Sequence, residues 1–207
     1  IKGMTKYADA LFYGNGIKED KEKAGQYFKF LADNNVVEAI TQYGYMLYMG
    51  EGVKQDWNEA EKLLLKAKDH GDTRAMYIYA GLLYKKSGLD YYNEESLSYI
   101  NMAALLGNSD AQLHYGIHLE KQGKISDSLS FIKKAADQEN TDAMNLYGIR
   151  LYCGKGIKQN KKEGIKYLKK AADCGCKESA EFLWKLNLAN KDIIKYIKIL
   201  VDNGNIM

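Results

Sequence analysis

Proline is absent from this chain of 207 residues, so its turns must be made by other residues. The 19 glycines and the many asparagines are the residues that can end helices and form turns. There are only three cysteines, an odd and low number that excludes a disulfide-stapled scaffold. The chain also lacks an Asn-X-Ser/Thr glycosylation motif. Together these absences favour the cytosol or nucleus, and we expect a cytoplasmic protein.

The chain also lacks a large excess of either basic or acidic residues. The 30 basic and 27 acidic residues are interleaved and leave a net charge of +3, which argues against the basic stripe that nucleic acid requires. No apolar run reaches the length of a membrane span, and the first residues lack the apolar core of a secretory signal. With 46% hydrophobic and 28% charged residues, the chain has the composition of a folded protein without a membrane segment.

An internal repeat is what the sequence does contain. The same aromatic or aliphatic position, which we call the anchor, recurs at intervals of 36, 36, 36, 32 and 36 residues. The anchors are Tyr7, Tyr43, Tyr79, Tyr115, Tyr147 and Leu183. A small residue follows the first five anchors, and a leucine stands four positions after them. An alanine precedes four of them by four positions. This spacing predicts a helix, called helix A, in each unit. The recurring small slot predicts that another helix backbone approaches there.

A second helix, helix B, is predicted in each unit after a turn. Gly-X-Gly ends helix A at Gly14–Gly16, Gly50–Gly52 and Gly154–Gly156. Asp20, Asp56 and Asn160 are suited to cap the helix B that follows. Helix B then carries a small residue, an apolar pair three positions later, and in most units a closing Ala-Ala pair. Lysines and glutamates fill its other side, which predicts a solvated face.

The predicted units form one array over residues 1–207. Their approximate ranges are 1–35, 36–71, 72–107, 108–140, 141–175 and a degenerate unit 176–207. The fourth unit lacks the Gly-X-Gly turn, which explains its shorter period. In the sixth unit Trp184 occupies the small slot, which predicts altered packing, and its helix B is expected around Ile193–Val201. Because Ile1 already falls inside helix A, we expect the chain to be a piece of a longer protein.

These features together resemble the Sel-1-like repeat family, relatives of the tetratricopeptide repeats. The residues that match best run from Ala143 to Gly175 and from Ala39 to Gly71. The resemblance implies an all-α fold, an α-solenoid in which antiparallel helix pairs stack into a right-handed superhelix. It also implies a non-enzymatic adaptor that binds other proteins. Periodicity alone predicts only the helix pairs.

The partner-binding surface is predicted from slots that vary between units. Helix A has such slots one before, three after and six after the anchor, and in tetratricopeptide-like solenoids helix A lines the concave face. The candidate residues are Gln42, Met46, Met49, Ile78, Leu82, Lys85, His114, His118, Lys121, Leu146, Arg150 and Cys153. Their apolar and adaptable side chains suit an amphipathic helix or an extended peptide.

An alternative interpretation places four of these residues in the core between units. The four are Met46, Ile78, Leu82 and Leu146. Arg150, His118 and Lys121 are expected to be exposed. Charge reversal at Arg150 and His118 is therefore expected to weaken partner binding without lowering the melting temperature.

Four other patterns are given structural interpretations. His114 and His118 could chelate a metal, but Tyr115 stands where a metalloprotease motif needs glutamate. Ser130-X-X-Lys133 lacks the companion motifs of serine β-lactamases. The Gly-X-Gly turns follow a helix rather than a strand, unlike phosphate-binding loops. The cysteines Cys153, Cys174 and Cys176 are expected to be free thiols, with a thiolate cluster or disulfide as the alternative.

No catalytic constellation remains, so we expect no enzyme activity and no cofactor. The favoured function is a scaffold for a protein or peptide partner, without nucleic acid, and self-association through exposed apolar ends is possible. A regulatory or targeting region of a larger enzyme, such as a kinase or a quality-control ligase complex, is the alternative. A hydrolase built on the repeat is disfavoured because a base, a nucleophile and an oxyanion site are missing.

Overall fold

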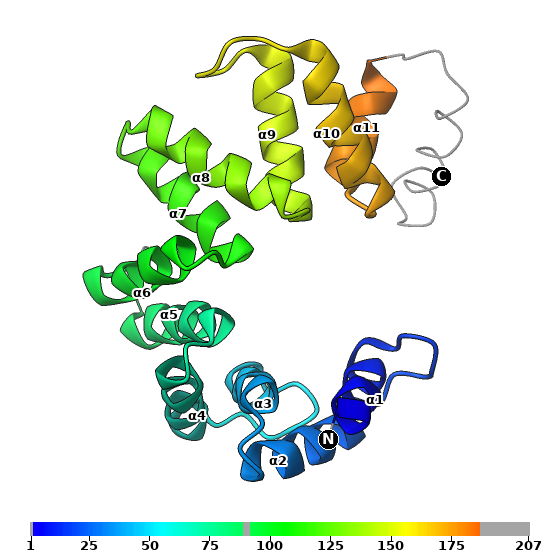
Figure 1. Cartoon of the computed structure of the whole chain (residues 1–207), viewed down its shortest axis with the longest axis vertical. Coiled ribbons are helices and arrows are strands. Elements are labelled where there is room, and N and C mark those ends of the chain that lie inside the picture. The colour runs from blue at the N-terminus through cyan, green and yellow to red at the C-terminus, as the bar shows by residue number, and fades with distance from the viewer. Residues whose placement is uncertain (1, 89–91, 187–207) are drawn as a thin grey trace. The chain divides into compact units, whose positions relative to one another are not determined.

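The computed structural model describes residues 2–88 and 92–186, and this part of the chain contains helices and no strands. Within residues 1–106 and within residues 107–186, consecutive helices lie side by side (Figure 1). The helices are α1 (Lys2–Tyr13), α2 (Lys21–Asp33), α3 (Val37–Met49), α4 (Trp57–Asp69), α5 (Thr73–Ser87), α6 (Glu94–Leu105), α7 (Ser109–Lys121), α8 (Ile125–Asp137), α9 (Thr141–Cys153), α10 (Lys161–Asp173) and α11 (Lys177–Lys185). The odd-numbered helices are the predicted A helices and the even-numbered ones the predicted B helices. The all-α repeat fold expected from the sequence is confirmed.

Two compact units divide the chain, residues 1–106 and residues 107–207. Within each, an A helix packs on the B helix of its own repeat and on the B helix of the preceding repeat. The array as a single body and its right-handed twist stay predictions. The helix B expected near Ile193, Tyr196, Ile197, Leu200 and Val201 lies outside the described residues.

The helix boundaries follow from local chemistry, as predicted. The side chains of Asp20, Asp56 and Asn160 accept hydrogen bonds from backbone N–H groups in the first turns of α2, α4 and α10. These bonds satisfy donors that the helix itself leaves free. Gly50 and Gly154 end α3 and α9 with φ angles of 77° and 74°, a conformation that costs other residues strain.

The small slot marks a close approach of two helices, also as predicted. A Cβ added to Gly164 of α10 would lie 2.7 Å from the carbonyl oxygen of Gly148 in α9. A Cβ added to Gly148 would meet the Gly164 carbonyl oxygen at 3.0 Å. The two backbones therefore touch, and a methyl group at either glycine would push them apart.

Aromatic rings join helix A to helix B inside a repeat. The anchor ring meets a helix B ring edge to face, with centroids 5.0 to 5.4 Å apart, in the pairs Tyr7–Tyr27, Tyr79–Tyr99, Tyr115–Phe131 and Tyr147–Tyr167. This geometry is favourable for aromatic quadrupoles. Trp184, which replaces the small residue in α11, is 42% exposed. None of the helices within residues 2–88 and 92–186 is long and hydrophobic enough to span a bilayer.

Candidate partner-binding surface

The A helices present a different stripe to solvent from the one predicted. Residues five before, two after and six after the anchor are exposed or half-buried in the first five repeats. We call them the exposed stripe. In residues 1–106 it consists of Lys2, Asp9, Tyr13, Glu38, Tyr45, Met49, Arg74, Gly81 and Lys85. In residues 107–207 it consists of Asp110, Ile117, Lys121, Asp142, Ile149 and Cys153. At 100° per residue, the predicted stripe was rotated from this one by about 50°.

Because of that rotation, some of the predicted binding residues are accessible to solvent and the others are buried. Met49, Lys85, Lys121 and Cys153 are exposed, and His114, His118 and Leu146 are half-buried. The buried residues are Gln42, Met46, Ile78, Leu82 and Arg150. For Met46, Ile78 and Leu82 the alternative interpretation is therefore correct, because they pack between neighbouring helices. A buried side chain has no surface to offer to a partner.

The predicted exposure of Arg150 is wrong, because its side chain forms an ion pair between α9 and α7. Arg150 is only 5% exposed and its Nη2 donates to a carboxylate oxygen of Glu120. Its Nε is buried without a hydrogen-bond partner. Charge reversal at Arg150 would place two carboxylates together, so the expectation of an unchanged melting temperature is not supported either. The sequence held one indication of this ion pair: Glu120 replaces the bulky apolar residue that the other units carry at its slot.

Gln42 is buried because it joins two A helices of the first compact unit. Its Oε1 accepts a hydrogen bond of 2.7 Å from Arg74 Nη2 of α5, while its Nε2 has no hydrogen-bond partner. Beside it, Thr41 Oγ1 donates to Asp72 Oδ2 at 2.8 Å. These bonds tie one repeat to the next, so we interpret both residues as structural.

The two histidines of α7 form no metal site with other described residues. Among residues 2–88 and 92–186, no group of three or more His, Cys, Asp or Glu side chains is placed to hold a metal ion. Burial lowers the pKa of His114, and the nearby Asp110 and Asp142 oppose that effect. Burial also lowers the pKa of His118, with Lys121 and Lys124 adding to it. At neutral pH both rings are therefore uncharged.

The three cysteines are free thiols. Cys153 and Cys174 are exposed, whereas Cys176 is buried and lies 3.4 Å from Glu178 Oε2. Burial raises the pKa of the Cys176 thiol, which disfavours the reactive thiolate. Ser130 lies on the exposed side of α8, next to the half-buried Phe131, and the repeat explains both residues.

A groove lined with tyrosines, which sequence reasoning missed, lies in the first compact unit. Its volume is about 260 Å³, and we call it the tyrosine groove. It is lined by Tyr45, Tyr48, Tyr77, Ile78, Gly81, Tyr84, Tyr92 and Ile100. The Tyr48 hydroxyl donates to the carbonyl oxygen of Gly81 at 3.2 Å, and the Tyr45 hydroxyl donates to Glu51 Oε1 at 3.4 Å. The groove includes Tyr45 and Gly81 of the exposed stripe. The several tyrosines between Tyr77 and Tyr84 are the feature of the sequence that could have indicated this groove.

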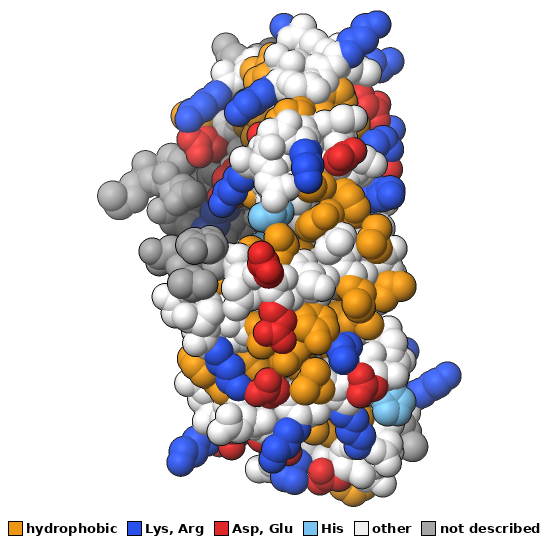
Figure 2. Space-filling view, turned by 90° about the vertical axis from the view of Figure 1, so that its left-hand side faces the viewer, with side chains coloured by type: hydrophobic (Ala, Val, Ile, Leu, Met, Phe, Trp, Pro, Cys, Tyr) orange, Lys and Arg blue, Asp and Glu red, His pale blue; other side chains and the backbone are white. Residues whose placement is uncertain are grey.

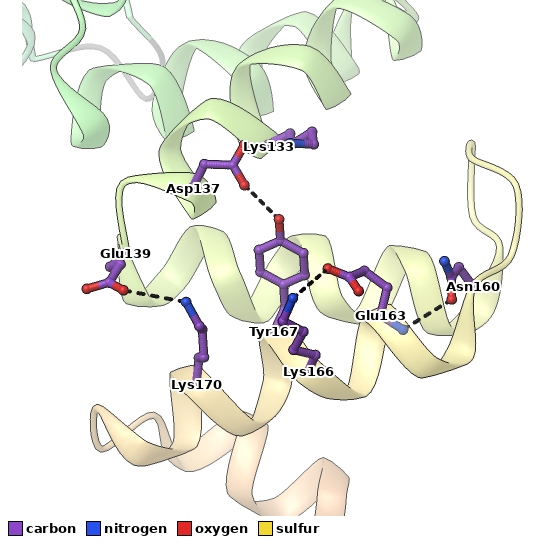
Figure 3. A network of polar contacts seen from close by, with 8 residues as sticks. All are labelled: Lys133, Asp137, Glu139, Asn160, Glu163, Lys166, Tyr167 and Lys170. Atoms are coloured by element: carbon purple, nitrogen blue, oxygen red, sulfur yellow. Dashed lines mark hydrogen bonds and ion pairs between the residues drawn. The ribbon is translucent and has the colours of Figure 1, made fainter.

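A polar network occupies the B helices of the second compact unit (Figure 3). The Tyr167 hydroxyl of α10 donates to Asp137 Oδ1 of α8 at 2.7 Å, and Lys133 pairs with the same carboxylate. Lys170 of α10 lies 3.5 Å from Glu139, beyond the end of α8. Burial and the Asp137 carboxylate raise the pKa of Tyr167, which keeps its hydroxyl a donor. These contacts join adjacent repeats, so we assign them to stability.

An apolar patch lies at the C-terminal end of α6 and includes Leu106, the residue that caps the helix. Met102, Leu105 and Leu106 are 45%, 69% and 58% exposed. They share one face of the helix by their spacing. In the other repeats the slot of Leu105 holds an aspartate, and polar residues or cysteine hold the slot of Leu106. Hydrophobic side chains gather over the middle of the face drawn in Figure 2, the side on which α6 lies in Figure 1. The fold does not require apolar residues at these slots.

The stacked helix pairs place the chain among tetratricopeptide-like helical repeat proteins. The Sel1 repeat model matches residues 1–36, 37–72 and 141–176, so the chain belongs to the Sel1 repeat family. The family resemblance inferred from the sequence is thereby confirmed. Repeats of this kind generally serve as protein-interaction scaffolds and are typically not catalytic.

Solved structures share the fold. A Sel1 repeat protein from Oxalobacter formigenes superposes with a TM-score of 0.72 at 23% identity, covering 89% of this chain and 77% of that one. A protective antigen of uropathogenic Escherichia coli gives 0.66 at 23% identity, covering 98% of this chain but only 46% of that one. An immunity protein from Pseudomonas aeruginosa gives 0.71 at 18% identity, covering 94% and 73%. Comparison with curated proteins finds no match.

Proposed function

We propose that this chain is a non-enzymatic scaffold that binds a protein partner on the exposed stripe of its A helices, with the tyrosine groove as the main contact in residues 1–106. The observation that carries the proposal is the gathering of five tyrosines around one groove. Tyrosine offers a large, rigid contact area with a polar tip, and interfaces are enriched in it. A buried ring at the centre of an interface contributes more than most other contacts.

One larger hollow of the same compact unit is less suited to this role. It measures about 500 Å³ and lies beside α2 and the turn after α3. Its lining includes Glu22, Lys29 and Lys54, flexible charged side chains that would lose entropy on binding. Among the described residues, those that line the tyrosine groove carry no charge.

Crosslinking from defined positions tests the proposal. A photoreactive amino acid would be placed at Met49 or Lys85 on the exposed stripe, and at Lys62 on the exposed side of α4 as the matched control. The chain would be exposed to an extract of its source cells. We expect one partner to be crosslinked from Met49 and Lys85 and not from Lys62. Equal labelling from all three positions, or labelling from Lys62 alone, would show that the A helices are not the binding face.

A further inference from the structure

We propose that Arg74 of α5 binds a side-chain carboxylate of the partner beside the tyrosine groove. The inference rests on the proposed function and adds the chemistry of one contact on the same surface. The partner segment would carry an aspartate or glutamate next to the residues that enter the groove.

The position of Arg74 on the exposed stripe places it beside the tyrosine groove. Tyr77 and Ile78, which line the groove, follow Arg74 by three and four positions and so share its side of α5. Tyr45 lines the groove from the neighbouring A helix, α3. Burial raises the pKa of Tyr45, and the positive charge of Arg74 opposes that effect, so the two side chains are close in space. A segment that contacts the groove therefore passes within reach of the guanidinium group.

A buried glutamine holds the exposed Arg74 side chain in place. Arg74 Nη2 donates to Gln42 Oε1 at 2.7 Å, and Gln42 is only 2% exposed. A guanidinium group has five N–H donors in one plane. Within residues 2–88 and 92–186 the bond to Gln42 is the one hydrogen bond of this side chain, so the other donors remain for water or for a partner. A side chain that is already oriented loses less entropy on binding than a mobile one.

No carboxylate of the described residues forms an ion pair with Arg74. Burial raises the pKa of Asp9 in α1, and Arg74 opposes that effect, but the two side chains are not paired. The other arginine of the chain, Arg150, is buried and paired with Glu120. Arg74 therefore keeps an unpaired positive charge on the surface where the partner is proposed to bind.

The fold does not require an arginine at this slot. Arginine makes up only two of the 30 basic residues of the chain, and Arg150 has a structural role in its ion pair. In the first, second, fourth and fifth repeats the slot of Arg74 holds Lys2, Glu38, Asp110 and Asp142. Arginine forms two parallel hydrogen bonds with a carboxylate, and protein interfaces are enriched in arginine and depleted of lysine. These preferences favour a role for Arg74 in recognition.

The charges near Arg74 favour a carboxylate over a phosphate group. Domains that recognise phosphopeptides gather several arginines, whereas the exposed stripe holds no other arginine. A phosphate monoester carries about −1.5 to −2 charges at neutral pH, so the nearby Asp9 would repel it more strongly than a carboxylate. We therefore assign a singly charged, negative group to this contact.

Selection from a random-sequence peptide library displayed on phage tests the inference, with the 207-residue chain as the target. The matched variants are Arg74→Glu and Lys62→Glu, which make the same charge change on the exposed stripe and on the exposed side of α4. We expect the parent chain and Lys62→Glu to select aspartate or glutamate at one fixed position of the peptides. Arg74→Glu should lose that preference and select lysine or arginine there instead.

Fluorescence anisotropy of one acidic peptide selected on the parent chain measures the size of the effect. Arg74→Gln should weaken its binding about tenfold, because a charge-assisted pair is lost. Asp9→Asn should strengthen it about twofold, because a negative charge near the guanidinium group is removed. A purely structural role of Arg74, through its bond to Gln42, would lower the melting temperature without producing these opposite changes.

The outcomes separate this inference from the proposed function. No binding peptide, peptides without an acidic position, or an acidic position that persists in Arg74→Glu would overturn the carboxylate assignment. If crosslinking from Met49 and Lys85 still labelled a partner in that case, the scaffold function would stand without it. If Arg74→Glu or Arg74→Gln unfolded early, Arg74→Lys would replace it, with affinity expected to fall about threefold because the charge is kept and the planar fork is lost. Unchanged affinity in that variant would also overturn the assignment.

Discussion

Arg150 of α9 forms an ion pair with Glu120 of α7, and both residues stand in slots that hold apolar side chains in the first three repeats. The slot of Arg150 holds Met46 and Leu82 in the second and third repeats. The slot of Glu120 holds Phe12, Tyr48, Tyr84 and Tyr152. Two charged residues that depart from the repeat pattern therefore neutralise each other between α7 and α9.

Replacing one member of this pair should destabilise the protein. Arg150→Leu leaves the Glu120 carboxylate without its partner, and we expect a loss of about 2–4 kcal/mol in the free energy of unfolding. The double variant Glu120→Tyr/Arg150→Leu recreates the Tyr48 and Leu82 combination and should recover most of that loss. Chemical denaturation measures all three proteins. A single variant as stable as the parent would show that the ion pair contributes nothing.

Two glycines should respond oppositely to the same added methyl group. Gly164→Ala forces the α9 and α10 backbones apart, with an expected cost of about 1–3 kcal/mol. Gly81→Ala meets only ordinary contacts and gains helix propensity, so stability should rise by up to about 1 kcal/mol. Thermal unfolding of both variants measures whether each substitution raises or lowers the stability. A destabilising Gly81→Ala would mean that the Tyr48 ring does not accommodate the added methyl group.

Stability should fall as the pH is lowered from 7.5 to 5.5. The pKa of His114 is lowered in the folded state, mainly by burial, so the unfolded chain binds the proton more readily. Unfolding therefore becomes easier as the pH falls through the ordinary histidine pKa of about 6.5. His114→Gln should reduce this dependence, and because the pKa of His118 is lowered as well, the double variant His114→Gln/His118→Gln should reduce it further. An unchanged slope in His114→Gln would assign the dependence to another group.

The apolar patch on α6 should promote association between molecules. The substitutions Met102→Lys, Leu105→Asp and Leu106→Gln install the residues that the fourth repeat carries in these slots. We expect less concentration-dependent association, because exposed apolar area drives it, and a stability change within about 0.5 kcal/mol for each surface site. Light scattering over a range of concentrations measures the effect. The same association in the triple variant would place the contact on another surface.

The features that the sequence predicted correctly depend on local chemistry. The caps at Asp20, Asp56 and Asn160 act within one helical turn, and the left-handed glycines act at a single residue. The contact between Gly148 and Gly164 was predictable because several units repeat the same small slot. Because the same slots recur in several units, a substitution in one unit does not hide the pattern, and the fold and the family could be inferred from the sequence alone.

Only the tertiary structure decided which side of helix A meets solvent. Slots whose residues differ between repeats are of two kinds: some are exposed, and others lie in the core and exchange side chains of compatible volume. The predicted stripe and the exposed stripe differ by a rotation of only about 50° around helix A. Met46 and Leu82 vary without being exposed, and Arg150 is polar yet buried because Glu120 lies opposite. The tyrosine groove is assembled from α3, α5 and α6 together with Tyr92, which precedes α6. The sequence by itself determined the helix pairs and their family, whereas packing between repeats determined the surface left for a partner.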